Sequence, residues 1–258
     1  MKTQNLTQKL NFYELIGVIL GDGCIKYYPS HKVYTLEITG DAKDDQEYFS
    51  KLSKLITSIT NKTPTVRISI DKKKRALRLE LHSKKFLEFL LNDVGITNKK
   101  KSFNAEIPKK YLEWKYSKHI IRGIFETDGS LYFSKSKKIK YTSYPRIEIK
   151  TSSKKLALQI FELLKQKAFK VQKRPSKTDK TIRVYLSGSE MLNKWLKEIG
   201  FSSMKKYSKY LFWKKFGYYI PKTPYKKRMI LIREHGQVAK ASACRADIRG
   251  FKSLCSLL

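Results

Sequence analysis

The sequence has few of the residues that form disulfide frameworks or zinc sites. Its 258 residues include three cysteines and four histidines. Cys24, Cys244 and Cys255 are isolated, without the paired spacing of metal-binding or disulfide motifs, and the histidines do not cluster with them. This pattern argues against a zinc centre and against a disulfide framework, so we expect any bound metal to have oxygen ligands.

Long apolar runs are also missing. No stretch of about 18 consecutive apolar residues, the length that crosses a membrane, occurs in the chain. The N-terminus shows no secretory signal peptide. We therefore expect a soluble, intracellular protein that is not secreted and has no membrane partner.

Acidic residues are scarce. The chain has 22 Asp and Glu against 56 Lys and Arg, a formal net charge of +34, and its 16 tyrosines and 13 phenylalanines are scattered through the basic regions. Such a charge repels itself in a compact monomer and therefore indicates a polyanionic partner. Nucleic acid is the first candidate, although ribosomal and membrane-surface proteins have similar compositions.

Two segments of the chain follow one pattern. They are LIGVILGDG, which ends at Gly23, and IRGIFETDG, which ends at Gly129. Each is an apolar, helix-like run that closes on Asp-Gly and is followed by a strand-like stretch. A single Asp-Gly is explained by an ordinary turn at a helix C-terminus, but two copies in matched surroundings indicate a shared function.

Small residues recur at a four-residue spacing within both runs. Residues four apart lie on the same face of an α-helix, so Gly17 and Gly21 form one smooth stripe, and Gly123 and Thr127 form another. An interior glycine costs a helix roughly 1 kcal/mol relative to alanine, and the close approach of a second helix offsets such a cost. We expect these four residues to form the interface between two parallel helices.

Parallel packing would bring together Asp22 and Asp128, which lie at the ends of the two runs. Two carboxylates held side by side repel each other unless a divalent cation lies between or beside them. Carboxylate oxygens suit Mg²⁺, which binds one or two carboxylates together with phosphate oxygens and water. The pair therefore predicts metal-dependent phosphoryl chemistry.

The duplication extends beyond these segments. Residues 78–96 (RLELHSKKFLEFLLNDVGI) align without a gap to residues 183–201 (RVYLSGSEMLNKWLKEIGF). The separation equals that between Asp22 and Asp128 to within one residue, so a unit of roughly a hundred residues is repeated. Hydrophobic periodicity gives both units the order helix, strand, strand, helix, strand, strand, helix.

We predict an α+β fold in which two αββαββα units each form an antiparallel sheet backed by helices. The first half covers residues 1–103, a linker covers 104–116, the second half covers 117–228, and a C-terminal extension covers 229–258. The extension is poor in lysine, and it is a short packed helix, an extension without structure, or sequence inherited from a neighbouring reading frame. Strand alternation makes one sheet face apolar and leaves the polar, basic face free for DNA.

Both Asp-Gly segments resemble the signature of the LAGLIDADG homing endonucleases, in the monomeric form that carries two motifs. The first copy keeps Leu15, Gly17, Ile19, Asp22 and Gly23, and the second keeps Gly123, Asp128 and Gly129 within RGIFETDGSLYF. The first copy departs from the signature at Leu20, where the motif often has an acidic residue, whereas Glu126 fills that position in the second copy. In the family this position does not bind metal, so both expected metal ligands are present.

The resemblance implies a saddle of two antiparallel sheets, joined at a central pair of motif helices, that binds a long, asymmetric duplex DNA target as a monomer. It implies a site-specific endonuclease that hydrolyses one phosphodiester on each strand across the minor groove and leaves 3′ overhangs. Asp22 and Asp128 would be catalytic and would each hold a divalent metal, with the backbone carbonyls of Gly21 and Thr127 as further ligands. The expected cofactor is Mg²⁺, with Mn²⁺ as a substitute and Ca²⁺ supporting binding without cleavage.

Members of the family also place a basic residue near each cleavage centre, often a lysine after the last helix of the unit. The repeat pairs Lys101 with Lys206 at that place, and both are expected to be catalytic. Lys100 and Lys205 are the neighbouring alternatives.

The strand ends that approach the metals differ between the two halves. The family often has a polar side chain there, whereas the register gives Gly40 in the first half and Thr151 in the second. Together with the difference between Leu20 and Glu126, this predicts two cleavage sites that need not cut at the same rate.

A two-stranded β-ribbon fits the major groove of DNA, and strand alternation predicts which side chains face it. In the first half these are Lys26, Tyr28, Ser30, Thr35, Glu37, Arg67 and Arg78, and in the second half they are Tyr132, Ser134, Ser136, Arg146, Glu148, Lys150, Lys173 and Arg183. Glu37 and Glu148 are either hydrogen-bond acceptors for cytosine or ordinary surface charges.

Two other functions fit parts of the sequence. An RNA maturase or a DNA-binding regulator on the same fold would bind without cleaving, but it would not need two adjacent carboxylates that repel phosphate. A basic ribosome-associated protein would need neither the helix stripes nor the repeat. The favoured hypothesis is an endonuclease, intron-encoded or free-standing, in a mitochondrion, a chloroplast or a prokaryotic cytoplasm.

Overall fold

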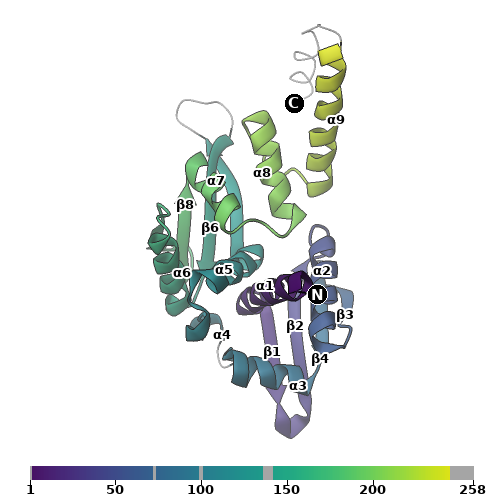
Figure 1. Cartoon of the computed structure of the whole chain (residues 1–258), viewed down its shortest axis with the longest axis vertical. Helices are drawn as coiled ribbons and strands as arrows, with labels where there is room; N and C mark the ends of the chain where they lie inside the picture. Colours follow the sequence, from purple (N-terminus) through teal and green to yellow (C-terminus); the bar gives the residue numbers. More distant parts are fainter. Residues whose placement is uncertain (1, 72–73, 99–100, 136–141, 245–258) are drawn as a thin grey trace.

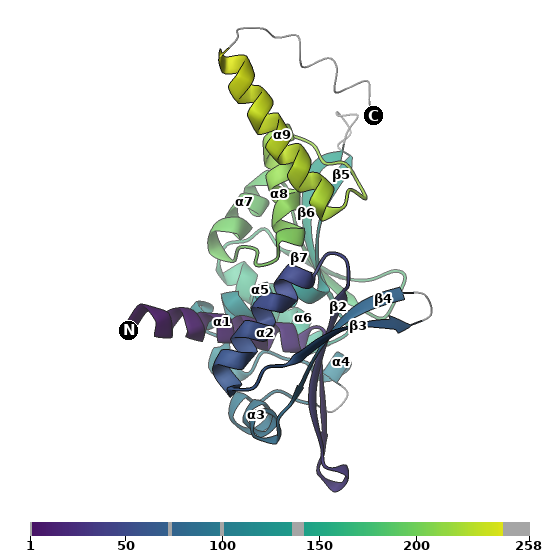
Figure 2. The same ribbon diagram turned by 90° about the vertical axis from the view of Figure 1, so that its right-hand side faces the viewer.

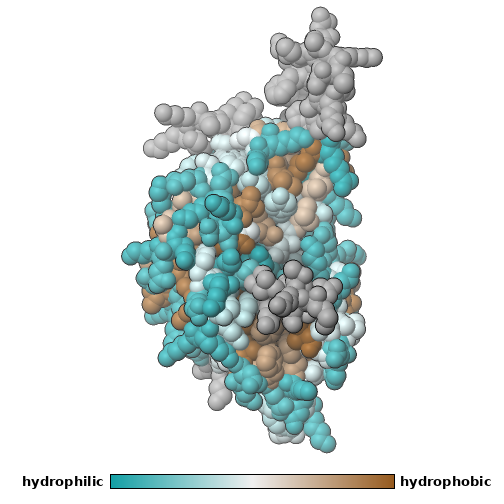
Figure 3. All heavy atoms as spheres, in the orientation of Figure 1, coloured by the Kyte–Doolittle hydropathy of each residue, from teal (hydrophilic) through white to brown (hydrophobic). Residues whose placement is uncertain are grey.

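The structure is a computed structural model of the chain, and it describes residues 2–71, 74–98, 101–135 and 142–244 (Figure 1). None of the described helices is long and apolar enough to cross a membrane. Hydrophilic side chains cover most of the face seen in Figure 3, and apolar ones gather beside α8 and the start of α9.

The first half is one helix–sheet unit. Its elements, in chain order, are α1 (Lys2–Leu20), β1 (Gly23–Tyr28), the 3₁₀ turn η1 (Pro29–His31), β2 (Val33–Asp41), α2 (Gln46–Thr60), β3 (Thr65–Asp71), β4 (Lys74–His82), α3 (Lys84–Glu88) and the π-helical turn η2 (Phe89–Val94).

The second half repeats this order after two short connecting elements and continues into two further helices. The elements are α4 (Lys101–Asn104), η3 (Lys109–Tyr111), α5 (Trp114–Asp128), β5 (Gly129–Lys135), β6 (Thr142–Thr151), α6 (Lys154–Gln166), β7 (Gln172–Pro175), β8 (Ile182–Ser187), α7 (Ser189–Glu198), α8 (Met204–Phe216) and α9 (Tyr225–Cys244).

Each unit contains a four-stranded antiparallel sheet. Sheet A has the strand order β1-β2-β4-β3, and sheet B has the equivalent order β5-β6-β8-β7. The sheets lie on either side of the paired helices α1 and α5 (Figures 1 and 2). The predicted α+β fold with two αββαββα units is therefore confirmed.

One face of each sheet is buried under helices. The inward-facing side chains of the central strands, β2 and β4 in sheet A and β6 and β8 in sheet B, include Leu36, Ile38, Leu79, Leu81, Ile147, Ile149, Val184 and Leu186. Burying one such side chain contributes roughly 1.5–3 kcal/mol. The alternation that buries these residues turns the polar residues of the same strands outward.

The segment that joins the halves is bound to the second unit. Gln159 of α6 accepts a hydrogen bond from the backbone nitrogen of Ile107 at 2.8 Å and donates to its carbonyl oxygen at 3.0 Å. Ser153 donates to the carbonyl oxygen of Ala105 at 2.6 Å. The expected linker is therefore held against α6, and α5 begins at Trp114, within the residues assigned to that linker.

Helices α8 and α9 were not expected from the sequence as packed elements of this length. They lie against each other beyond sheet B (Figure 2), and α9 begins before the boundary expected at residue 229. Arg228 explains the packing: it is 2% exposed and donates to the hydroxyl of Ser208 at 3.0 Å, to the hydroxyl of Tyr219 at 3.2 Å and to the carbonyl of Lys205 at 2.8 Å.

Arg228→Ala is expected to destabilise the α8–α9 region by about 3 kcal/mol, because it leaves several buried polar groups without a partner. Limited proteolysis should then cut α9 faster than in the wild type. Arg233→Ala, on the exposed side of the same helix, is the matched control and should not change the rate. Equal protection of α9 in both variants would contradict the anchoring role.

A buried histidine makes stability depend on pH. His119 in α5 is 8% exposed, and within the described part of the chain neither of its ring nitrogens has a hydrogen-bond partner. Burial, assisted by the charge of Arg122, lowers the pKa of His119 to about 4. The unfolded chain takes up a proton near pH 6.5, so stability is lost as the pH falls from about 6.5 towards 4.

We expect His119→Leu to remove this contribution. The difference in urea midpoint between the variant and the wild type should grow in favour of the variant between pH 7 and pH 5. A difference that stays constant over this range would show that His119 does not titrate as described.

Candidate active site between the two sheets

The motif helices α1 and α5 touch through their backbones. A Cβ atom placed on Gly17 would collide with the carbonyl oxygen of Ile120 and lie 2.9 Å from the Cα of Gly123. A Cβ on Gly123 would collide with the carbonyl oxygen of Glu14 and lie 2.8 Å from the nitrogen of Val18. No other residue type fits at either place without moving a helix, which is why the small residues recur at this spacing.

The stripe continues to the ends of the two helices. A Cβ on Gly21 would collide with the hydroxyl of Thr127 and lie 3.2 Å from Oδ2 of Asp128. The Asp128 carboxylate therefore lies against the backbone next to Asp22. The hydroxyl of Thr127 donates to the carbonyl of Ile124 at 2.9 Å, so this side chain is turned back onto its own helix.

Neither Asp-Gly pair forms a left-handed turn. Gly129 has φ −95° and ψ 157°, an extended conformation, and β5 begins at this residue directly after Asp128 ends α5. A Cβ on Gly129 would lie 2.7 Å from the Cα of Phe125. Glycine is required here because the chain doubles back closely on its own helix, and the aspartate is thereby placed where the helix meets the sheet.

Both aspartates line one cavity of about 740 Å³ between the halves. Gly21, Lys150 and Thr151 are among the other residues that line it. The donors that this surface offers are carboxylate, hydroxyl and carbonyl oxygens, which fit a hard divalent cation. Residues 2–71, 74–98, 101–135 and 142–244 contain no group of three or more His, Cys, Asp or Glu side chains suited to a metal, so phosphate and water would complete the coordination.

A second, smaller cavity lies between β2, α2 and the end of α5, and it shares Asp22 and Thr39 with the larger one. Asp22, Thr127, Gly40 and Asp45 line it. A Cβ on Gly40 would lie within 2.7 Å of two ring carbons of Phe49, which explains why this strand end has no side chain whereas its equivalent in sheet B is Thr151. The surroundings of the two aspartates therefore differ, as the sequence predicts.

The lysine expected at the second cleavage centre is buried against the end of α5. Lys206 is 6% exposed, donates to the carbonyl oxygen of Phe125 and lies 4.4 Å from the centre of the Phe125 ring. Burial lowers the pKa of Lys206 to about 8. Among the described residues Lys206 lines neither cavity, and its contacts support the end of α5, so its role at a scissile phosphate stays a prediction.

The neighbouring alternative, Lys205, contacts a residue that lines the smaller cavity. Nζ of Lys205 lies 3.0 Å from Oδ2 of Asp45, which lines the smaller cavity beside Asp22. This ion pair joins α8 of the second half to the start of α2 in the first. The side chain of Lys101 and all of Lys100 lie outside the described residues, so the first of the expected lysines stays a prediction.

Glu126 lines the smaller cavity beside Asp22 and is held there by structural partners. It accepts hydrogen bonds from the backbone nitrogen of Ser202, at 2.8 Å, and from the hydroxyl of Ser203. Burial raises the pKa of this carboxyl. The acid in the second motif therefore fixes the segment that leads into α8. Leu20 takes its place in the first motif, and the described residues of the first half contain no equivalent helix of that length.

The outer face of sheet A contains the expected polar residues. Lys26, Thr35, Glu37, Arg67 and Arg78 lie on it, Tyr28 ends β1 with an exposed side chain, and Ser30 lies in η1. Glu37 is not a free surface charge: Nζ of Lys26 lies 2.9 Å from it and Nη1 of Arg78 lies 3.5 Å from it. Arg67 forms a 2.7 Å ion pair with Glu80, and Thr35 is hydrogen-bonded to His82 at 3.0 Å.

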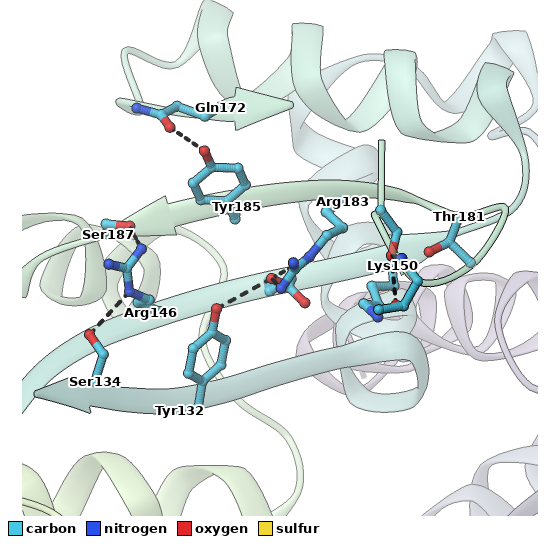
Figure 4. Close-up of polar contacts among 12 residues, drawn as sticks. Tyr132, Ser134, Arg146, Lys150, Gln172, Thr181, Arg183, Tyr185 and Ser187 are labelled. Carbon is cyan, nitrogen blue, oxygen red and sulfur yellow. Dashed lines mark hydrogen bonds and ion pairs between the residues drawn. The ribbon is translucent and has the colours of Figure 1, made fainter. Parts of the chain in front are cut away.

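The outer face of sheet B has a connected network (Figure 4). Arg183 bonds to Glu148 at 2.5 Å, and Tyr132 donates to the same carboxylate at 3.3 Å. Arg146 donates to Ser134 at 3.1 Å, and Lys150 lies 3.4 Å from Asp179. Ser136, also expected on this face, lies outside the described residues.

Lys173 was expected on this face, and that expectation is wrong. It pairs with the buried Val184, and its Nζ lies 5.0 Å from the centre of the Phe161 ring on the helix-covered side. Arg174, which was not predicted, pairs with Arg183 on the outer face and lies 4.5 Å from the centre of the Tyr185 ring. The internal repeat could have predicted this position, because Arg174 occupies in sheet B the place that Arg67 occupies in sheet A.

Two related sheets with polar outer faces, joined by helices that end in adjacent carboxylates, define a two-motif saddle fold. The model of the LAGLIDADG DNA endonuclease family matches residues 13–193, and the chain belongs to this family. No curated protein sequence matches the chain.

Several solved structures have the same fold. The homing endonuclease I-DmoI in complex with DNA and Mn has a TM-score of 0.51 at 16% identity, covering 76% of this chain and 98% of that one. I-WcaI bound to its DNA recognition sequence has a TM-score of 0.51 at 18% identity, covering 75% and 87%. Meganuclease I-SmaMI, bound to uncleaveable DNA, has a TM-score of 0.51 at 14% identity, covering 81% and 90%.

Proposed function

We propose that this protein is a site-specific, metal-dependent endonuclease that hydrolyses one phosphodiester on each strand of duplex DNA across the minor groove and leaves 3′ overhangs. The observation that carries the proposal is the placement of Asp22 and Asp128 in one cavity between two sheets whose outer faces are polar. Two adjacent carboxylates in a chain of net charge +34 have no evident use in binding a polyanion and a direct use in holding a cation beside it.

The residues have separate roles in this proposal. Asp22 and Asp128 hold divalent cations, one beside each scissile phosphate, with the backbone carbonyls of Gly21 and Thr127 as further ligands. A bound Mg²⁺ supplies activation of water and stabilisation of the leaving oxygen. Lys205, which is paired with Asp45 of the smaller cavity, and Lys150, which lines the larger one, provide positive charge near the aspartates.

The proposed partner is a long, asymmetric duplex bound by one copy of the chain. The two halves present different side chains on equivalent strands, so the two half-sites should differ in sequence. Related structures bound to DNA support the partner, and the complexes of I-DmoI with DNA and Mn and with DNA and Ca support a divalent cofactor. We propose Mg²⁺ or Mn²⁺ for cleavage and Ca²⁺ for binding without cleavage.

A library of duplex targets tests the function directly. The full chain is incubated with the library and Mg²⁺, and all newly formed ends are sequenced. The expected result is a small set of related targets, cut on both strands with 3′ extensions. Specific binding without cutting in Mg²⁺ or Mn²⁺ would replace the endonuclease with a DNA-binding regulator, and binding confined to RNA would replace it with a maturase.

A further inference from the structure

We propose that Arg146 and Arg183, on the outer face of sheet B, each recognise one guanine, and that these guanines lie about four base pairs apart in one half-site. The guanine bound by Arg183 is the nearer one to the cleavage centre. The inference rests on the proposed function and adds to it a sequence feature of the DNA that the chain selects.

Arg183 is held along one edge of its guanidinium group. Its Nε and Nη2 donate to Oε2 of Glu148 at 3.0 and 2.5 Å, and Tyr132 donates to the same oxygen at 3.3 Å (Figure 4). The Glu148 side chain is 8% exposed whereas that of Arg183 is 34% exposed, so the carboxylate fixes the arginine from below. The outer edge, formed by Nη1 and Nη2, has the geometry that pairs with O6 and N7 of guanine.

Arg146 is also restricted to one orientation, but by different partners. Its Nε donates to the hydroxyl of Ser134 at 3.1 Å and its Nη1 to the hydroxyl of Ser187 at 3.4 Å, so neighbouring strands hold it from both sides (Figure 4). The guanidinium carbon lies 5.5 Å from the centre of the Tyr144 ring. These contacts restrict the side chain and leave the hydrogens of Nη2 for an acceptor, which lowers the entropy cost of recognising a base.

The strand register gives the spacing between the two guanines. Arg146 lies opposite Ser187, whereas Arg183 lies opposite Lys150, four residues further along β6. At about 3.3 Å per residue the two arginines are separated by about 13 Å along the sheet, which matches about four base pairs at 3.4 Å each. Lys150 lines the cavity that contains Asp128, so Arg183 is the inner residue of the two.

Sheet A does not repeat this arrangement. The residue equivalent to Arg146 is Thr35, which is hydrogen-bonded to His82. The residue equivalent to Arg183 is Arg78, whose Nη1 lies 3.5 Å from Glu37 and whose buried Nε has no partner among the described residues. Two restrained arginines on one sheet therefore predict that the guanine pair marks the half-site bound by the second half.

The test is a binding selection that needs no cleavage. The full chain selects from a randomised duplex library in Ca²⁺, and the bound DNA is sequenced. The wild type should enrich a guanine pair separated by about four base pairs in one half-site. Arg183→Lys should lower the preference for the inner guanine by about 10- to 100-fold and leave the outer one unchanged, and Arg146→Lys should do the reverse. Arg233→Lys, on the exposed side of α9, is the control and should leave both preferences intact.

Enriched targets without guanines at this spacing would overturn the inference, and this part of the test needs no variant. The inference would also be overturned if the preference for the inner guanine survived in Arg183→Lys and was lost in Glu148→Gln. Glu148 would then recognise that base pair itself, by contacting its cytosine. Incubating the enriched duplexes with Mg²⁺ separates the two proposals: enrichment of the guanine pair without cutting contradicts only the endonuclease, and cutting of targets that lack the pair contradicts only the inference.

Discussion

Asp22→Asn and Asp128→Asn are each expected to lower the rate of double-strand cleavage by about 1,000-fold or more, because metal ions contribute several kcal/mol to such a reaction. Asparagine keeps the shape of the side chain and removes the charge that holds the cation. DNA affinity should be unchanged or higher, because a negative charge beside the phosphates is lost. Cleavage rates on a selected target and equilibrium binding in Ca²⁺ measure the two effects separately.

The control for this experiment is Asp93→Asn, which removes an exposed carboxylate at the end of η2 and should leave cleavage unchanged. The two aspartates have different surroundings, with Gly40 and the Asp45–Lys205 pair beside the smaller cavity and Thr151 and Lys150 beside the larger one. The single variants should therefore accumulate nicked DNA to different extents. Cleavage that persists at the wild-type rate in both variants would show that these aspartates are not the site.

Gly17→Ala and Gly123→Ala are expected to reduce the free energy of unfolding by about 3 kcal/mol each, or to prevent folding. The added methyl group meets the carbonyl oxygen of Ile120 in one case and that of Glu14 in the other. Backbone atoms of a packed helix cannot move aside as the end of a flexible side chain can. Urea denaturation followed by circular dichroism measures the loss.

Gly217→Ala serves as the comparison for both variants. A Cβ on Gly217 would meet nothing within 4 Å, so the only cost is the left-handed backbone, with φ 75°. That strain costs roughly 1–2 kcal/mol. If Gly17→Ala were no more destabilising than Gly217→Ala, the helices would not be packed as closely as described.

The repeat and the motif helices could be predicted because their signals are local. Gly17, Gly21, Gly123 and Thr127 recur at a spacing that only a helix interface explains, and the inward residues of the long strands alternate regularly. The outer-face residues of β1, β2, β3, β4, β5, β6 and β8 followed from that alternation.

The errors fall where local signals are weak. Strand β7 has four residues and all of them are exposed, so its phase could not be determined and Lys173 was assigned to the wrong face. Lys205 and Lys206 differ by about 100° around α8, and only tertiary packing decides which of them is buried. The buried bonds of Arg228, which organise α8 and α9, join residues that have no pattern in common along the chain.

The backbone contact between α1 and α5 also fixes the distance between the two aspartates. No side chain lies between Gly17 and Gly123, so nothing at this joint can repack to change the separation of the two aspartates when a different DNA sequence is bound. The side chains on the outer faces of the two sheets can be exchanged one at a time without touching this joint. In an endonuclease built this way the protein, and not the target sequence, sets the offset between the two cuts. Variants selected for new target sequences should therefore all leave overhangs of one length.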